Sequence, residues 1–488
     1  MITFAGRILM QKKFVGSLFL LLLVNVLVKP FWIFGIDLEV QNRVGGEAYG
    51  YYAAVLSFSM IINIVLDLGL AHYSNRSISR KPAEVASHFS DLILLKLVLA
   101  FVYLLFAFVA GSWLGYLGDQ WMVLLYLAIG QALSSLILFF RAHLAGLHLF
   151  KYDSLMSIVD KLLMIIMAGY VLYFNDAFLM TIERFALLQT LSYGLAALLG
   201  FVLIYPRVKG VFPKLKWKGF LVRLKGSAPY ALLIFLMALY TRVDSVMLQQ
   251  LVGDLENGIY AQAFRLLDAI NQPAYLFSVI LLPLFSGMLA RGESVTALSK
   301  LAFSLLYVLC LTILLGVYFA APGLMDLLYL DHSASSAPVL QVLLFSSLAF
   351  GTTFVFGTLL TAKGDLSLLN KVAFIGFVLN IFLNLILIPR YGAIGAAFAT
   401  VVTQSSAALV QMFLCFKKVN LHYGAEFWLR LFSFSLVAIV LSILLQNYLL
   451  VVWWQKSLLV ASLIAMIALL SGLLPLKDAY RLIKPNQK

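Results

Sequence analysis

The sequence predicts an all-α integral membrane protein with about fourteen transmembrane helices. Of its 488 residues, 63% are hydrophobic and 11% are charged, whereas a soluble domain is about 45–50% apolar and about 25% charged. Apolar runs long enough to cross a bilayer recur along the whole chain, and Lys and Arg gather in alternate loops between them. These observations exclude an ordinary soluble protein.

The candidate spans are apolar runs of at least the ~20 residues that a helix needs to cross a ~30 Å hydrocarbon core. The first run follows Lys12-Lys13, is too long for a signal peptide and lacks a cleavage site, so we expect it to be the first span. The predicted spans are 14–36, 48–72, 90–115, 121–140, 154–174, 185–205, 227–251, 257–288, 298–321, 337–361, 367–388, 393–416, 428–448 and 457–475.

The distribution of basic residues predicts the orientation. With the N-terminus inside, the inner segments hold 23 Lys and Arg residues and the outer segments hold 4. Positive residues favour the cytoplasmic side, so both termini are predicted to be cytoplasmic. Much of the net charge of +14 is therefore topological and does not indicate a nucleic-acid surface. The run VKGVFPKLKWKGFLVRLKG, 208–226, is predicted to lie along the inner membrane surface.

One short stretch occurs twice. NRVGGEAYGYYA, 42–53, returns as QLVGDLENGIYA, 250–261, and each copy falls at the outer turn that enters an even-numbered span. The paired glycines predict positive φ angles or close backbone approach. Six spans separate the copies, which indicates two parallel bundles of six helices. The predicted parts are an N-terminal bundle at 1–205, a basic cytoplasmic linker at 206–226, a second bundle at 227–416, and two further helices with a tail at 417–488.

Charged residues within the spans are the candidate site, because a cation at the bilayer centre is costly unless it faces water or a partner. Five cations lie too deep to reach the surface easily: Lys29, Arg242, Arg265, Lys96 and Lys161. The acids counted inside are Asp67, Asp160, Asp244 and Asp268; Arg265 and Asp268 are spaced to pair locally, whereas the neighbours Asp160 and Lys161 are not expected to face each other. This surplus of positive charge favours an anionic cargo such as a diphosphate.

Three segments resemble the Wzx-type oligosaccharide flippases of the polysaccharide transporter family. VGGEAYGYYAAVLSFSMIINIVLDLGLAHYSNRSISR contains a Gly-x-x-x-x-Gly-x-Tyr turn followed by Asp67-Leu68-Gly69-Leu70 and by Arg76 and Arg80. YTRVDSVMLQQLVGDLENGIYAQAFRLLDAINQPAYLFSVILLPLFSGM is similar to the central segment of the family, and IPRYGAIGAAFATVV, 388–402, to the entrance of its twelfth span. The resemblance covers roughly residues 1–420.

The resemblance implies a fold and a cargo. The implied fold is that of the multidrug/oligosaccharidyl-lipid/polysaccharide exporters, in which two six-helix lobes form a V. The implied cargo is a sugar chain on polyprenyl diphosphate. It would cross to the outer leaflet by alternating access and serve the synthesis of O-antigen, capsule or a related surface polysaccharide. No family binding residue is carried over by identity. We expect the diphosphate to lie between Lys29, Arg242 and Arg265, with Lys96 and Lys161 as inner entry contacts.

The predicted transporter is not an enzyme, because transport needs no covalent chemistry, and no catalytic residue, metal or cofactor is expected. The sequence also has no Walker-type nucleotide motif. Proton or sodium gradients would supply the energy, with Asp67, Asp244 and Asp268 as candidate coupling carboxylates. The other expected partners are membrane lipids and not nucleic acid, and the expected location is the bacterial inner membrane.

Three alternatives stay open at this point. A lipid II flippase stays open because fourteen spans also occur in that branch of the superfamily. A multidrug/cation antiporter of the same fold would prefer a cavity rich in carboxylates. A membrane glycosyl polymerase or ligase would need a sizeable outer loop, and the longest one here, about 322–336, is short; we expect its Asp331-His332 to form a solvated turn.

Overall fold

The computed structural model describes most of the chain. The described residues are 27–71, 74, 78, 85–118, 120–147, 149–174, 179–209, 217–448 and 452–473. Outside them lie residues 210–216 of the predicted basic linker, the motif residues Arg76 and Arg80, and both chain ends. Within these ranges the chain forms helices and turns, with no strand.

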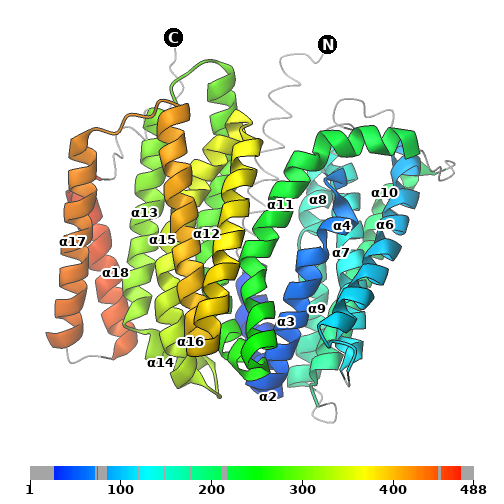
Figure 1. The fold of residues 1–488 in the computed structure, drawn as a ribbon, viewed down its shortest axis with the longest axis horizontal. Helices are drawn as coiled ribbons and strands as arrows, with labels where there is room; N and C mark the ends of the chain where they lie inside the picture. Colours follow the sequence, from blue (N-terminus) through cyan, green and yellow to red (C-terminus); the bar gives the residue numbers. More distant parts are fainter. Residues whose placement is uncertain are drawn as a thin grey trace. The chain divides into compact units, whose positions relative to one another are not determined.

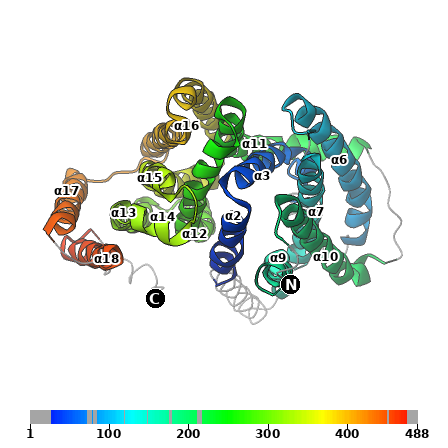
Figure 2. The same ribbon diagram turned by 90° about the horizontal axis from the view of Figure 1, so that it is seen from below.

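The chain divides into two compact units, Met1–Gly258 and Ile259–Lys488. In the first unit α7, α9 and α10 lie side by side, and α3 lies against α11 (Figures 1 and 2). Its helices are η1 (Trp32–Asp37), α2 (Leu38–Val44), α3 (Gly46–Ile62), α4 (Ile64–Asp67), α6 (Val85–Trp113), α7 (Trp121–Gly146), α8 (Phe150–Met156), α9 (Val159–Tyr173), α10 (Ile182–Val208) and α11 (Trp217–Val252).

The second unit contains most of α12 and all later helices. There α15 packs against α13 and α16, while α17 and α18 pack against each other and on α13 (Figure 1). The helices are α12 (Asp254–Ala290), α13 (Thr296–Tyr318), α14 (Ala321–Leu328), α15 (Ser333–Lys363), α16 (Leu366–Lys418), α17 (Ala425–Tyr448) and α18 (Trp453–Leu470).

The predicted all-α, multi-pass membrane fold is confirmed. Twelve of the described helices are long and apolar enough to cross a membrane. One of these, α16, consists of two helices joined at Gly392, whose φ of 54° and ψ of −132° interrupt the helical backbone. The first predicted span begins outside the described residues and continues into η1 and α2. The described helices thus account for thirteen of the fourteen predicted spans, and most of the first predicted span lies outside the described residues.

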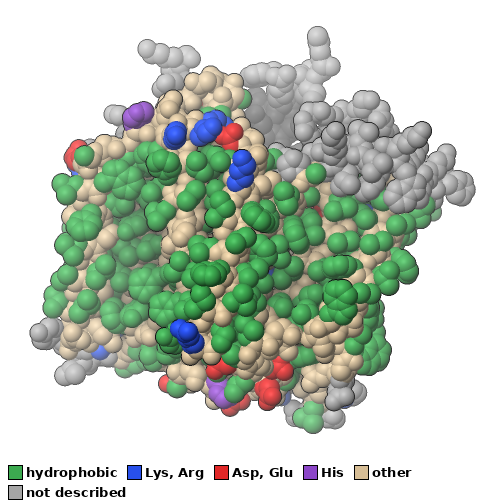
Figure 3. Space-filling model, in the orientation of Figure 1, with side chains coloured by type: hydrophobic (Ala, Val, Ile, Leu, Met, Phe, Trp, Pro, Cys, Tyr) green, Lys and Arg blue, Asp and Glu red, His purple; other side chains and the backbone are tan. Residues whose placement is uncertain are grey.

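The sides of the helices carry apolar side chains that a soluble protein would bury. Phe101, Ile375 and Phe432 are each more than 65% exposed. On the face of the second unit seen in Figure 3, hydrophobic side chains cover the middle, and charged side chains lie near the two ends of the helices. This distribution suits contact with lipid along the sides and with headgroups and water at the ends.

The first glycine of each repeated turn has the positive φ angle predicted from the sequence. Gly45 has a φ of 84° before α3, and Gly253 has a φ of 104° before α12. A side chain at either position would be strained by the backbone conformation, since only glycine adopts such angles freely. The first half of the glycine prediction is therefore confirmed in both copies.

The second glycine of each turn allows the two copies to touch backbone to backbone. A Cβ atom on Gly50 would lie 1.9 Å from the carbonyl oxygen of Asp254, and one on Gly258 would lie 2.0 Å from that of Gly46. The Nδ2 atom of Asn257 also donates to the carbonyl oxygen of Gly50, at 2.6 Å. Because no side chain fits in these gaps, the predicted close approach is confirmed.

This contact explains where the first unit ends. α11 packs on α3, and the start of α12 packs on the first repeated turn, so the first unit extends through Gly258. The sequence instead assigned residues from 227 onward to the second bundle by counting spans. That four-part division stays a prediction, because the units defined by contacts do not test which helices move together.

Candidate functional site

A group of three cations forms the candidate site in the first unit: Lys29, Arg141 and Lys161, which we call the cation group. Lys161 lies in the first turn of α9, Arg141 near the end of α7, and Lys29 just before η1. Lys29 interacts electrostatically with both other cations and with Asp160. The structure therefore brings together two of the five cations selected from the sequence and adds Arg141, which the sequence had placed in an inner loop.

Each of the other two cations has a carboxylate partner. The ammonium of Lys161 lies 2.7 Å from Oδ2 of Asp160, so the expectation that these neighbours would not face each other was wrong. α9 begins directly after Ile158, whose backbone is not helical, and the flexible lysine stem bends back toward the adjacent carboxylate. Arg141 pairs with Asp153, with 2.8 Å between Nε and Oδ1. The group therefore contains two acids, Asp153 and Asp160, beside its three cations.

Aromatic rings surround the ammonium of Lys161. Its Nζ lies 5.9 Å from the ring centre of Trp32 and 5.2 Å from that of Tyr193. Such distances allow cation–π attraction, which strengthens away from water. The side chain of Lys161 is nevertheless 26% exposed, so the charge is accessible as well as supported.

A chain of hydrogen bonds extends from the cation group through the first unit. Lys161 donates to the hydroxyl of Tyr193 at 3.5 Å, Gln189 Nε2 donates to the same hydroxyl at 3.4 Å, and Tyr52 donates to Gln189 Oε1 at 2.8 Å. Tyr52 belongs to the first repeated stretch. Gln189 and Tyr193 were not among the predicted residues, because neither carries a charge. The available signal was a polar pair at i,i+4 within an apolar span.

The predicted surplus of cations across the interior stays a prediction, but its count of acids was incomplete. It used four interior acids, and the structure buries Asp37 and Asp91 as well, with 2% and 9% of their surfaces exposed. Asp37, expected in an outer loop, ends the π-helix η1 and accepts a hydrogen bond from Tyr49 at 2.9 Å. These two acids reduce the surplus of positive charge that was counted from the sequence.

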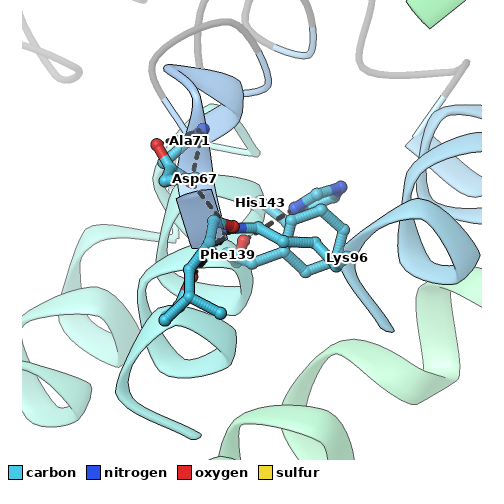
Figure 4. Close-up of polar contacts among 7 residues, drawn as sticks. Asp67, Ala71, Lys96, Phe139 and His143 are labelled. Atoms are coloured by element: carbon cyan, nitrogen blue, oxygen red, sulfur yellow. Dashed lines mark hydrogen bonds and ion pairs between the residues drawn. The ribbon is translucent and has the colours of Figure 1, made fainter. Parts of the chain in front are cut away.

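Lys96 lies in a separate arrangement at a break in the second span. Its ammonium donates to Asp67 at 2.6 Å, to Ser135 at 2.8 Å and to the carbonyl oxygen of Leu66 at 2.8 Å. Figure 4 shows Asp67 between Lys96 and the backbone of Ala71. The lysine side chain is 1% exposed. With three acceptors and no access to water, Lys96 is a buried ion-pair partner in this conformation.

The backbone explains why Asp67 can reach Lys96. Directly after Asp67 the helix ends, because Leu68 has a φ of 45° and Gly69 a φ of 82°. A non-glycine residue with positive φ is strained by about 1–2 kcal/mol. The Asp-Leu-Gly-Leu motif therefore marks a turn that aims the carboxylate back into the bundle.

A cavity of about 560 Å³ joins these two charged arrangements. It lies among α3, α4, α7 and α11, and Asn63, Asp67, Arg141, Asp153 and Phe235 are among its lining residues. Its volume is within the range of small-molecule sites, about 300–1,000 Å³. Asp67 and Arg141 therefore line one cavity within the first unit, whose other lining residues are mostly apolar.

The remaining predicted residues lie on α11 and α12. Asp244 is 1% exposed and Arg242 is partly buried, both in the first unit; Arg265 and Asp268 are partly buried in the second unit. The expected local pair of Arg265 and Asp268 stays a prediction.

The second unit contains a neutral polar group that charge counting missed. Asn380 and Asn384 on α16 are fully buried, with 3.1 Å between Nδ2 of Asn384 and Oδ1 of Asn380. Nearby in the chain, Thr400 approaches the hydroxyl of Tyr260 at 3.3 Å. Among the described residues, no three His, Cys, Asp or Glu side chains are placed to hold a metal ion.

Comparison with known proteins identifies the family. The profile of the family described as "Polysaccharide biosynthesis protein" matches residues 15–289, more than half of the chain. The chain belongs to this family. A relative from Methanocaldococcus jannaschii, "Uncharacterized membrane protein MJ1375", is 25% identical over 393 residues, which cover 76% of this chain and 90% of that protein.

Solved structures show which fold this family member has. The chain is similar to "Lipid II flippase MurJ, inward closed conformation", with a TM-score of 0.67 and 16% identity over 97% of this chain and 100% of that one. It is also similar to an inward-facing "multidrug resistance MATE family transporter of the MOP superfamily", with a TM-score of 0.62 and 13% identity over 80% and 94% of the two chains. The protein therefore has the MurJ/MATE-like transporter fold.

Proposed function

We propose that this protein is a flippase for polyprenyl-diphosphate-linked oligosaccharides and carries them across the membrane by alternating access. The observation that carries the proposal is the cation group, in which Lys29, Arg141 and Lys161 share two carboxylates. Membership of a polysaccharide biosynthesis family and a transporter fold support this cargo class. The Wzx-type specificity expected from the sequence motifs belongs to this proposal.

The chemistry of the group suits a diphosphate linked to sugar. An arginine presents two N–H groups in a plane that matches two phosphate oxygens, and lysines add compact positive charge. Tyr193 and Gln189 offer a hydroxyl and an amide beside Lys161, and these groups suit sugar hydroxyls. The prenyl chain would remain in the lipid, so only the polar part of the cargo needs a wet path.

The other predicted residues receive distinct roles in this proposal. Arg242 and Arg265 remain cargo contacts on α11 and α12. Lys96 acts through Asp67, since its ammonium already has three acceptors. Asp67 is the leading coupling carboxylate, because a proton or a sodium ion at this cavity-lining group would weaken its bond to Lys96; Asp244 and Asp268 are the other two candidates.

The direct test is complementation of cells that lack their oligosaccharide flippase. Lys29→Gln, Arg141→Gln and Lys161→Gln are expected to lower surface polysaccharide at equal protein level, and Lys151→Gln is the matched control. Lys151 is an exposed cation in α8 of the same unit. Full export from all three variants would contradict the site, and absence of complementation by the parent chain with any oligosaccharide system would contradict the cargo.

Lipid II is the second candidate cargo. Similarity to MurJ over 97% of this chain, including the helices beyond the two bundles, favours it. Rescue of cells depleted of their lipid II flippase, without rescue of oligosaccharide export, would decide for lipid II.

For either cargo, the basic loops and both chain ends are proposed to be cytoplasmic, in a bacterial inner membrane. The accessibility of an engineered cysteine, Lys417→Cys, would test this orientation.

A further inference from the structure

A second cavity, of about 370 Å³, lies at one end of α13, α17 and α18 in the second unit. It is independent of the proposed transport site. The helix ends that form it adjoin the loops 291–295 and 419–424, on the side where the sequence places most basic residues. The residues that give the cavity its chemistry are Lys300, Glu426, Phe427, Arg430, Gly472 and Leu473.

Two cations line this cavity with one carboxylate. Arg430 forms an ion pair with Glu426 one turn away on α17, and half of the arginine side chain remains exposed. The ammonium of Lys300 lies 4.9 Å from the ring centre of Phe427, whose ring is buried and fixes the position of the lysine. The cavity therefore has one excess positive charge from α13 and α17.

Gly472 leaves room for the guanidinium. Its φ is 66°, and a Cβ atom there would lie 3.2 Å from Nη1 of Arg430. The turn at the end of α18 thus passes directly beside the arginine head. The pocket therefore combines the turn after α18, the ring of Phe427 and two cations, and these groups come from three different helices.

The two helices α17 and α18 carry exposed apolar side chains close in sequence to the cavity residues. Leu429 and Phe432 on α17 and Leu470 on α18 are all at least 68% exposed, and each lies within three residues of a cavity residue. A free phosphate ion would gain no binding energy from these apolar side chains. A phosphate attached to acyl chains would place its charge in the cavity and its chains along these side chains.

We propose that this cavity binds the phosphate headgroup of an anionic phospholipid from the leaflet that faces the basic loops. Basic pockets between transmembrane helices on the cytoplasmic side recognise anionic headgroups in this way. Lys300 and Arg430 are the headgroup contacts, and Glu426 competes with the lipid for Arg430. The bound lipid would add a contact between α13 and α17 at this end, beside the packing of α17 and α18 on α13.

The test is native mass spectrometry of the full-length protein with phosphatidylglycerol or phosphatidylcholine. The protein is expected to retain phosphatidylglycerol preferentially. Lys300→Gln and Arg430→Gln should each weaken that retention by about fivefold, since each cation near the surface contributes about 1 kcal/mol. The matched control is Lys417→Gln, an exposed cation in the last turn of α16 that does not line the cavity, and it should change retention much less.

A variant that should increase lipid retention distinguishes a loss of binding from misfolding. Glu426→Gln removes the competing carboxylate and should raise retention of phosphatidylglycerol, whereas Lys300→Arg and Arg430→Lys should preserve it. Unchanged retention in both glutamine variants at the two cations would overturn the proposal. So would displacement of the lipid by an equal concentration of inorganic phosphate, or stronger retention of polyprenyl diphosphate than of phosphatidylglycerol at this site.

Discussion

The two copies of the repeated turn have the same geometry, but the helices that follow them carry different polar groups. In both copies the first glycine has a positive φ angle and the second allows backbone contact. After the first copy, the span breaks at Asp67, which pairs with Lys96. After the second, α12 continues without such a break and carries Arg265 and Asp268.

The interiors of the units differ in the same way. Ion pairs occupy the described interior of the first unit, at Lys96, Lys161 and Arg141. In the second unit, buried amides and hydroxyls gather on α16, at Asn380, Asn384 and Thr403. The two turns therefore share a backbone geometry, whereas the polar groups inside the two units differ.

The largest effect on stability is expected at the Asp67–Lys96 pair. Asp67→Asn leaves the Lys96 ammonium buried without a counter-charge, and breaking a buried ion pair in this way lowers the free energy of unfolding by about 3–5 kcal/mol. The change is measured by denaturant unfolding in detergent micelles. The neutral counterpart in the second unit is Asn380→Ala, for which about 1–2 kcal/mol is expected.

A further variant isolates the charge effect at this pair. Lys96→Met in the Asp67→Asn background removes the unpaired ammonium and should restore much of the lost stability. Equal losses for Asp67→Asn and Asn380→Ala, with no recovery in the double variant, would show that the charged and neutral interiors are energetically alike.

An intermediate effect is expected where the two turns touch. Gly50→Ala and Gly258→Ala each place a Cβ atom within 2.0 Å of a backbone carbonyl oxygen, so the backbone must move. Overpacking of this kind lowers the free energy of unfolding by about 1–3 kcal/mol. The two losses, followed by thermal unfolding, should be similar, and Gly424→Ala, with open space around it, should lose much less. Very unequal losses would contradict the matched geometry.

The smallest effect is expected at the first glycine of each turn. Nothing lies within 4 Å of a Cβ atom on Gly45 or Gly253, so alanine there adds only backbone strain. About 1 kcal/mol of destabilisation is expected for each. Thermal unfolding of both variants provides the comparison, and stabilisation by either alanine would mean that its turn does not require positive φ.

Much of the fold was accessible from the sequence because its signals are local. Hydropathy and loop charges determine the spans, and the spacing of Gly45 and Gly50 against Gly253 and Gly258 revealed the repeated turn. The break in α16 at Gly392 lies between the predicted spans 367–388 and 393–416, where Pro389 and Arg390 interrupt the apolar run.

The candidate site was less accessible because partners come from distant helices. Lys96 and Asp67 are 29 positions apart and meet only because the chain turns at Leu68. Asp37 was expected in a loop because no local sequence pattern predicts a π-helix at the end of a span. Asp160 and Lys161 show the opposite error, since helical geometry was applied to a flexible lysine in the first turn of α9.

The central claim is that the cation group binds the diphosphate of the cargo. Its most direct test is flipping of a polyprenyl-diphosphate-linked oligosaccharide by the purified protein in proteoliposomes. Lys161→Gln is expected to lower the rate at limiting cargo about tenfold or more, because a charge-assisted hydrogen bond contributes about 1.5–3 kcal/mol. Lys151→Gln is expected to flip the cargo like the parent. Equal rates for both variants would contradict the account.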